Sequence, residues 1–414
     1  MTATLPLPVS TTLPLAGLRV LDFTWIGAGA LTTKLLADLG ADVIKIESRA
    51  RPDNLRLAPP YRPGAEDLEG SGYFATRNSS KRSFALDMTE PRSREIALQL
   101  AERCSVVTSN FRPGVMERWG LSYAGIRAVN PAVIYLAMPM QGRDGPHAAF
   151  TGFGSTISAL AGLVDLSGLP DRPGVGTGTH YPDHVPSPGH ALVALLAALV
   201  HRERTGEGQE IELSQLESTI NVIGPAIVEA SLGGRTRPRA GNRVPGASPH
   251  GVFACAGDDC WCAIACRAEG DWQALAAALG HREWLADPRF GTLLQRKLHE
   301  DELERLIGEA TSQRERSELV SALRARGVAA AAVNSSADVL LDPDLVARGY
   351  WQRVSHPVIG EMAIARPPFR MSGAERPSLR RPPLLGEHTA EIASALLGLS
   401  TEEIERLVEE GVLA

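Results

Sequence analysis

The chain of 414 residues has few features of membrane, secreted or nucleic-acid-binding proteins. Its longest apolar run, residues 191–200, is well short of the roughly 20 residues that span a bilayer. Five cysteines, an odd number in a long chain, do not indicate a disulfide framework. Residues 1–14 are broken by prolines and carry no basic segment, unlike a signal peptide. A net charge of −6 argues against a nucleic-acid partner, so we expect a cytoplasmic globular protein.

The length is sufficient for two domains and a large core. Near the N-terminus, residues 18–23 alternate apolar and polar side chains, as a strand does. Gly27 and Gly29 then form a turn, residues 31–39 have helical spacing, and residues 41–47 form a second strand. This βαβ unit predicts an α/β fold with a parallel sheet.

The strand–helix alternation continues to about residue 140, and a smaller α/β pattern begins near residue 250. Residues 48–80 lack periodicity and are expected to form a long loop, which in a compact domain is usually functional. The composition break at 233–242 marks a domain boundary. Further strands are expected at 84–87, 105–108, 130–137, 209–213, 251–255, 261–265, 329–333 and 361–365. Further helices are expected at 90–103, before residue 119, and at 156–163, 188–204, 215–232, 271–279, 303–309, 318–326, 388–397 and 401–412, the last with a Ser400–Glu403 capping box.

Asp183 stands between a glycine-rich segment, residues 174–178, and the start of a helix. Ser187 can cap that helix, and Pro188 suits its first position. A lone Asp before a helix is usually a cap or a turn residue. Asp183 is not at the expected cap, however, and the glycines allow a ligand to approach the backbone.

The position of Asp183 favours a nucleophile in the loop before the positive end of a helix. A carboxylate can attack a thioester to give a mixed anhydride, and the released thiolate can then attack the anhydride. The amides of residues 174–178 and the N-terminus of the following helix could donate hydrogen bonds to the developing oxyanions.

Other chemistries have weaker support. Gly27 and Gly29 with Glu47 partly match a dinucleotide fingerprint, but Thr32 stands where the third glycine belongs. His180, Asp183 and His184 could suggest a metal, yet Pro182 opposes the helix that would bring the two histidines to one face. Four clustered cysteines lack any CxxC pair and are interpreted as buried free thiols, namely Cys255, Cys260, Cys262 and Cys266.

Basic residues follow the expected strand ends near the N-terminus. Lysine is scarce, and Lys81 with Arg82 and Arg49 with Arg51 form two short basic pairs. Each pair alone reads as solvated surface, but at the carboxyl edge of a parallel sheet they suit a phosphorylated cofactor. Phe111 is expected at the same edge, where it could stack on adenine or pack in the core.

Several motifs together resemble the class III CoA-transferases, the group of formyl-CoA transferase, carnitine CoA-transferase and 2-methylacyl-CoA racemase. The resemblance spans nearly the whole chain. The motifs lie at residues 15–24, 37–47, 78–87, 109–114, 196–209 and 385–400.

The resemblance implies a Rossmann-like large domain formed by residues 1–225 and 345–414, a smaller α/β domain at 226–344, and an interlocked homodimer. The catalytic aspartate of the family falls on Asp183, and the expected cofactor is coenzyme A as acyl-CoA, without metal or NAD. The expected partners are an acyl-CoA and a carboxylate acceptor, with no nucleic acid and no membrane. The CoA contacts carry over to Ile26, Gly27, Lys81, Asn110, Phe111 and Arg118, with Arg49 as a nearby phosphate or adenine contact.

The resemblance predicts transfer of CoA to a carboxylic acid through an aspartyl-CoA thioester. The Tyr181-Pro182-Asp183 context favours dicarboxylic acids such as succinate. The chain departs from some members at Gly27 and Pro139, and its glycine flap is thin, with only residues 241–246 to represent it. These departures leave the acid open.

A racemase or isomerase on the same fold ranks second. It needs a histidine base near residues 150–160, where this sequence has none. His147 and His180 could only substitute from other positions. An NAD-dependent oxidoreductase is a remote third alternative.

Overall fold

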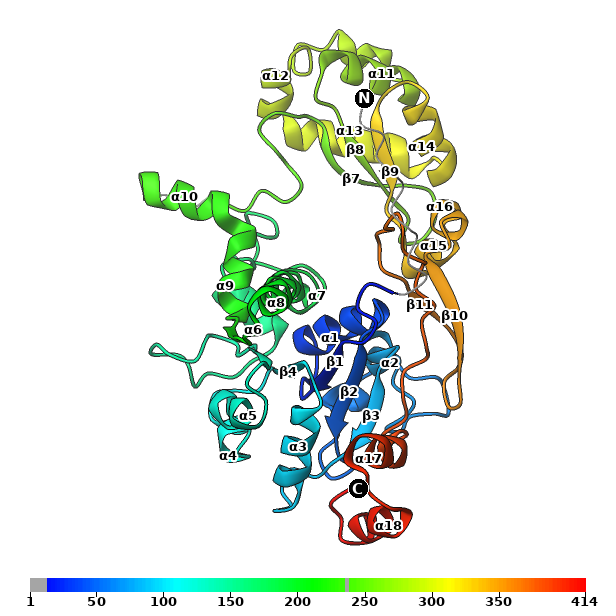
Figure 1. Cartoon of the computed structure of the whole chain (residues 1–414). Helices are drawn as coiled ribbons and strands as arrows, with labels where there is room; N and C mark the ends of the chain where they lie inside the picture. Colours follow the sequence, from blue (N-terminus) through cyan, green and yellow to red (C-terminus); the bar gives the residue numbers. More distant parts are fainter. Residues whose placement is uncertain (1–12, 235–237) are drawn as a thin grey trace, which may run out of the picture. The chain divides into compact units, whose positions relative to one another are not determined.

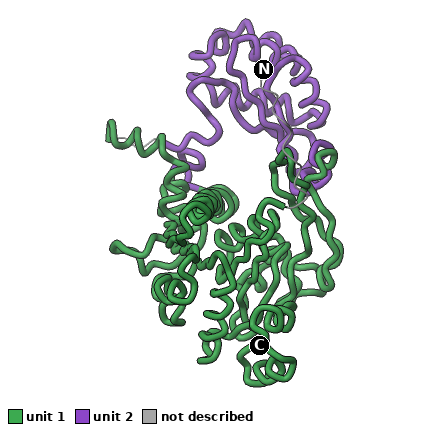
Figure 2. The backbone as a smooth tube through the Cα atoms, in the orientation of Figure 1, with its two compact units in different colours: residues 1–165, 175–237, 346–414 green, residues 166–174, 238–345 purple. Residues whose placement is uncertain are grey.

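The computed structural model describes residues 13–234 and 238–414. The chain separates into two compact units (Figure 2). The first contains the described parts of residues 1–165, 175–237 and 346–414, and the second contains residues 166–174 and 238–345. The first unit therefore draws on both ends of the chain, while the domain limits at 225 and 344 stay a prediction.

The first unit is built on a six-stranded sheet with the order β3-β2-β1-β4-β5-β6, in which every pairing is parallel. Figure 1 labels β1 to β4 of this sheet. β4 and β5 are buried along their whole length, as expected for central strands covered on both faces. The strands are β1 Arg19–Asp22, β2 Asp42–Glu47, β3 Arg82–Ala85, β4 Val106–Ser109, β5 Ile134–Ala137 and β6 Glu210–Glu212.

Helices cover both faces of this sheet. On one face α1 and α8 pack, and Ala191, Leu195 and Ala198 of α8 recur at helical spacing toward the strands. On the other face lie α3, α5, α17 and α18. The helices of this unit are α1 Ala28–Asp38, α2 Gly72–Asn78, α3 Ser93–Glu102, α4 Val115–Arg118, α5 Tyr123–Val129, α6 Gly154–Leu160, α7 Tyr181–His184, α8 Pro186–Thr205, α9 Gln215–Ile220, α10 Gly224–Gly233, α17 Thr389–Leu397 and α18 Thr401–Glu409.

The C-terminal part of the chain completes the first unit. A hairpin of β10 Trp351–His356 and β11 Gly360–Ala365 precedes α17. The Thr389 hydroxyl accepts a hydrogen bond from the Ala85 amide at 2.8 Å, which ties α17 to β3. Ser400 and Glu403 form the predicted capping box of α18, so that sequence signal is confirmed.

The second unit has an antiparallel sheet in the order β7-β8-β9 with its own core. Trp272, Leu303 and Leu319 contribute to that core from three helices, α11, α13 and α14. The elements are β7 His250–Ala254, β8 Trp261–Ala265, β9 Ala329–Ala332, α11 Glu269–Leu279, η3 Arg282–Leu285, α12 Leu293–Leu298, α13 Glu300–Ser312, α14 Arg316–Arg324 and α15 Ser336–Leu341, with α16 Pro343–Ala347 at the junction to the first unit.

The structure corrects three expectations. The segment 48–80 is not only loop, because it forms η1 Asn54–Leu57 and α2, which Asp53 and Ser71 cap. The helix expected at 215–232 is divided into α9, η2 Asn221–Ile223 and α10, and Pro225 in the first turn of α10 removes a backbone donor there. Ser187 lies inside α8 and is not its cap. Gly206, in contrast, ends α8 in the left-handed conformation.

The five cysteines are free thiols. Cys255, Cys262 and Cys266 are buried as predicted, and so is Cys104, whereas Cys260 is only partly buried and corrects the prediction. Burial raises the pKa of both Cys262 and Cys266 to about 12, which fits the reading as inert core residues. In the described part of the chain, no helix combines the length and apolarity needed to cross a bilayer.

Candidate active site

Asp183 lies in α7, a single helical turn, and not in a loop as expected. Pro182 is tolerated because it stands in the first turn, where no amide donor is required. The Asp183 residue is only 5% exposed. The carboxylate is therefore buried in the protein, three residues before the start of α8.

Two glycines form the walls around the Asp183 side chain. A Cβ on Gly27 would lie 2.5 Å from the Asp183 Cβ, and a Cβ on Gly154 would lie 2.7 Å from its Oδ2. Gly27 precedes α1, and Gly154 begins α6. Only residues without a side chain allow the starts of these two helices to approach the carboxylate so closely.

Burial raises the pKa of the Asp183 carboxyl to about 6, although the His180 charge, the Gly154 amide and the Arg77 charge each act to lower it. Poor solvation disfavours the charged form and makes the carboxylate more basic than an exposed one. At neutral pH most of the population is still ionised, which is the state that attacks an electrophile.

The Asp183 carboxyl borders a cavity of about 120 Å³. The cavity lies where β1 and β4 end, and the chain order of the sheet reverses between these two strands. Ligands of open α/β sheets bind at such reversal points. Ile26, Gly27, Asn110, Arg112, Met140, Phe150, Phe153 and Gln215 are among the residues that line the cavity.

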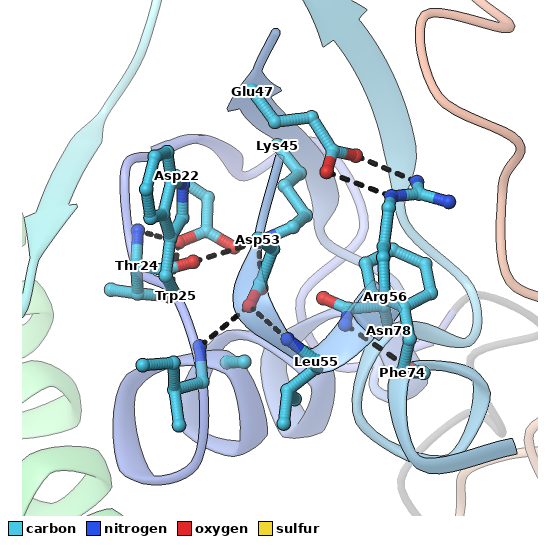
Figure 3. Close-up of polar contacts among 12 residues, drawn as sticks. Asp22, Thr24, Trp25, Lys45, Glu47, Asp53, Leu55, Arg56, Phe74 and Asn78 are labelled. Atoms are coloured by element: carbon cyan, nitrogen blue, oxygen red, sulfur yellow. Dashed lines mark hydrogen bonds and ion pairs between the residues drawn. The ribbon is translucent and has the colours of Figure 1, made fainter. Parts of the chain in front are cut away.

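The turn between β1 and α1 is held by the side chains of Asn110, which follows β4, and Asp53, which caps η1. Figure 3 shows Asp53 at this turn. Asn110 accepts a hydrogen bond from the Trp25 amide at 2.8 Å and donates one to the Trp25 carbonyl at 2.6 Å. Asp53 accepts from the Ile26 amide at 3.0 Å. Ile26 has a φ of 63°, a left-handed conformation that costs a β-branched residue about 1–3 kcal/mol.

The predicted CoA contacts fall into separate groups. Ile26, Gly27 and Asn110 share the cavity with Asp183. Phe111 meets Trp25 edge-on at 5.1 Å and Trp119 at 5.3 Å, and it lines a small second cavity at the ends of β2 and β3.

The two predicted arginine contacts lie apart from the Asp183 cavity. Arg49 follows β2 and Arg118 ends α4, and both side chains are exposed. Exposed guanidinium groups at this edge of the sheet are available to phosphate groups.

Lys81 is committed to protein partners. Its Nζ donates to the Asp22 carboxylate at 3.0 Å, the Ala30 carbonyl at 2.9 Å and the Asn78 Oδ1 at 2.9 Å. These bonds occupy the three donors of an ammonium group, and burial lowers the Lys81 pKa to about 8. Lys81 thus links the end of β1 to α1 and α2 through buried hydrogen bonds. Its contact with CoA stays a prediction.

Other residues near Asp183 were not found from the sequence. Arg77 places one guanidinium nitrogen 3.2 and 3.3 Å from the ring nitrogens of His184, and its buried Nε has no hydrogen-bond partner. Burial and the Arg77 charge lower the His184 pKa to about 4, so the ring is neutral. A cation this close to His184 opposes a metal there. No sequence motif singles out Arg77, and nothing in the sequence distinguishes Gly154 from the other glycines of the chain, which has 40 in all.

The predicted flap and the predicted oxyanion donors stay predictions. Residues 241–246 belong to the second unit, whereas Asp183 belongs to the first. There Arg243 lines a cavity of about 1110 Å³ and pairs with Asp301 and Glu304, each at 2.5 Å. The glycines at 174–178 are not among the described residues that line the Asp183 cavity.

Comparison with known proteins identifies the family. The sequence model of CoA-transferase family III matches residues 15–389, which is most of the chain. The chain belongs to CoA-transferase family III. It is accordingly an enzyme that transfers CoA.

The relatives are similar over nearly all of this chain. A probable CoA-transferase of Mycobacterium tuberculosis is 34% identical over 97% of the chain, which spans about half (50%) of that protein. A succinyl-CoA–D-citramalate CoA-transferase of Chloroflexus aurantiacus is 32% identical and covers 97% of this chain and 98% of its own length. The crystal structure of a CAIB/BAIF family protein from Brucella suis has a TM-score of 0.86 and 32% identity, over 93% of this chain and 100% of that one.

Proposed function

We propose that this family III member transfers CoA from an acyl-CoA to a carboxylic acid by a ping-pong mechanism, with Asp183 as the nucleophile. The observation that carries the proposal is the buried Asp183 carboxylate, packed between two helix starts and facing a cavity at the sheet reversal. Other buried carboxylates of the first unit, such as Asp22, Glu47 and Asp53, are engaged in ion pairs within the sheet region.

The first half-reaction regenerates the carboxylate form of the acyl donor. An Asp183 oxygen attacks the thioester carbonyl, the carbon–sulfur bond breaks, and CoA leaves as a thiolate. This thiolate attacks the Asp183 carbonyl of the mixed anhydride, and the donor acid leaves as its carboxylate. Asp183 then carries CoA as a thioester.

The second half-reaction is the same sequence in reverse with another acid. The acceptor carboxylate attacks the aspartyl thioester and releases the CoA thiolate. The thiolate attacks the acyl carbonyl of the new anhydride, which forms the product acyl-CoA and frees the Asp183 carboxylate. No proton or redox partner is consumed.

Each addition places a negative charge on a carbonyl oxygen. The backbone of Gly27, which precedes α1 and provides no side-chain cap, packs against the Asp183 side chain. Uncapped amides and the positive end of a helix favour an oxyanion. We assign the oxyanion contacts to this helix start in place of residues 174–178.

Several features support CoA at the carboxyl edge of the sheet. The strand order is that of doubly wound, Rossmann-like nucleotide-binding sheets. Phe111 offers an aromatic face for adenine, and Arg49 and Arg118 offer exposed cations for phosphates. The dicarboxylic specificity, with succinyl-CoA and succinate as the reference pair, is supported by the relative named for succinyl-CoA and D-citramalate.

The test is intact mass spectrometry after incubation with a panel of acyl-CoA thioesters. We expect an adduct of CoA on the native protein that hydroxylamine removes, and none on Asp183→Ala. The panel also identifies the accepted donors. Normal transfer by Asp183→Ala with retained CoA binding would refute the assignment.

A racemase or isomerase is the second candidate, favoured by one observation. His180 directly precedes α7 and lies close enough to Asp183 for its charge to affect that carboxyl. A base and an acid in contact with one α-carbon could exchange its proton. Deuterium entering the acyl α-carbon from solvent, with no acceptor acid present, is the result this alternative predicts.

A further inference from the structure

A buried ion pair between Lys45 and Asp53 holds the turn between β1 and α1, which borders the Asp183 cavity. Lys45 of β2 and Asp53, which caps η1, are fully buried, and Nζ and Oδ2 are 2.8 Å apart. The second oxygen of Asp53 accepts hydrogen bonds from the Ile26 and Leu55 amides, both at 3.0 Å. The Lys45 Nζ also donates to the Thr24 carbonyl at 2.8 Å. Figure 3 shows these side chains converging on one turn.

The pair holds the backbone on both sides of Trp25. Lys45 binds the carbonyl before it, and Asp53 binds the amide after it. Asn110 binds the amide and the carbonyl of Trp25 itself. Four backbone groups in succession are therefore fixed by side chains, although the segment belongs to no strand or helix.

The hydrogen bond from the Ile26 amide to Asp53 acts on the strained residue of the turn. Ile26 is held at a φ of 63°, which a β-branched residue rarely adopts. The next residue, Gly27, is the one whose backbone packs against Asp183. A change in the Ile26 conformation would rotate the Gly27 peptide and move the start of α1 relative to the carboxylate.

We propose that Asp53, held by Lys45, is a positioning residue for CoA transfer. It keeps Ile26 in the left-handed conformation and thereby keeps Gly27 and the first turn of α1 against Asp183. This inference rests on the proposed role of Asp183. Small displacements of groups around a reacting atom reduce turnover strongly, while binding through distant contacts is little affected.

The test removes both charges together, because removing one partner would leave an uncompensated buried charge. We expect Lys45→Met with Asp53→Ala to lower kcat at least about tenfold, with KM for acyl-CoA changed less than about threefold. Ile26→Gly relieves the strain, since glycine adopts this conformation freely. In an Ile26→Gly background, the same pair of substitutions should cost less than about threefold, as a double-mutant cycle measures.

A second buried pair provides the matched control. Lys34 and Asp38 form an ion pair near the far end of the same helix, α1. Lys34→Met with Asp38→Ala should affect stability without lowering kcat. The inference is overturned if the Lys45/Asp53 variant keeps its kcat, or if Ile26→Gly does not reduce the loss. If that variant does not fold, Lys45→Met with Asp53→Leu, which also removes both charges and the acceptor but fills more of the space, enters the same cycle and is judged by the same two outcomes.

Two readouts separate this inference from the proposed function. Absence of a CoA adduct on Asp183 in the parent enzyme defeats the proposed function. An adduct that forms equally fast in parent and Lys45/Asp53 variant defeats only the positioning role. Hydrogen exchange at the Ile26 amide should be faster in the variant than in the parent and in the Lys34/Asp38 control, and unchanged exchange also counts against the inference.

Discussion

At the scale of single residues, the site depends on a carboxylate placed where charge is costly. Burial raises the pKa of Asp183 to about 6, whereas the pKa of the buried Asp22 is lowered, because Lys81, Lys45 and hydroxyl donors outweigh its desolvation. The difference is one of partners, since Asp22 has a direct cation contact. Asp183 therefore keeps a raised pKa, whereas Asp22 is held in its charged form by its partners in the framework.

The Asp183 pKa predicts the pH dependence of the reaction. Below pH of about 6 the carboxyl is protonated and cannot attack, so kcat/KM should fall about tenfold per pH unit there. The 3′-phosphate of CoA titrates near pH 6 as well. A thioester of 3′-dephospho-CoA serves as the control, because a profile set by Asp183 keeps its inflection with that substrate. An inflection that disappears would assign the titration to the phosphate.

The same pKa predicts a stability effect with a defined sign. The folded-state pKa exceeds the ordinary value of 3.8, so the buried charge destabilises the fold increasingly from about pH 4 to about pH 6 and constantly above. Asp183→Asn should therefore be more stable than the parent by about 1–3 kcal/mol at pH 8. The gain should vanish below about pH 4 in denaturant titrations. A gain that persists at low pH would point to packing and not to charge.

At the scale of elements, the starts of two helices border the Asp183 carboxylate. α1 and α6 begin without side-chain caps at Gly27 and Phe153, while α18 begins with a full capping box. The unused amides of a helix start are the natural donors for an anion. Gly154 already supplies one such amide to the Asp183 carboxylate.

Substitution of the wall glycines tests this arrangement. In Gly27→Ala and Gly154→Ala the new methyl groups would come within 2.5 and 2.7 Å of Asp183 atoms, so the carboxylate or a helix start must shift. We expect kcat to fall about a hundredfold or more. Gly189→Ala in α8 is the control, because its methyl group meets no atom within 4 Å. It should retain kcat and gain up to about 1 kcal/mol of stability. Equal losses in all three variants would contradict a specific contact.

At the scale of the whole molecule, each unit has a hydrophobic core of its own. Among the described residues, the first unit also presents exposed apolar side chains. Helix α10 has no buried residue, and Ile227, Val228 and Leu232 on it are exposed, Leu232 to 84%. Exposed apolar side chains in such a group mark interaction surfaces.

We expect a second copy of the chain to cover these side chains in the interlocked homodimer that the family resemblance implies. Light scattering should give about twice the chain mass of 44.2 kDa, and threaded rings should not dissociate on dilution to nanomolar concentration. High salt should have little effect, since the contact is apolar. A monomer at micromolar concentration would contradict the proposal.

Local sequence signals predicted the elements that local physics determines. Alternating or continuous apolar residues located the six parallel strands, with shifts of a few residues at their ends. The Ser400–Glu403 capping box and Gly206 marked helix ends correctly because their hydrogen bonds are made within a few residues. The helix α2 was missed because Ser71, its cap, stands in a segment whose arginines and prolines conceal any periodicity.

The sequence by itself determined the parallel α/β framework, the family, and Asp183 as the carboxylate to consider. Only the tertiary structure decided which residues stand beside Asp183. Gly27, Gly154 and Arg77 are far apart in the chain, and their approach depends on where β1 and α2 end and where α6 begins in space. The same holds for Lys45 and Asp53, whose hold on Ile26 follows from packing between segments. Burial, and with it the pKa of Asp183, is a property of that packing and has no local sequence signal.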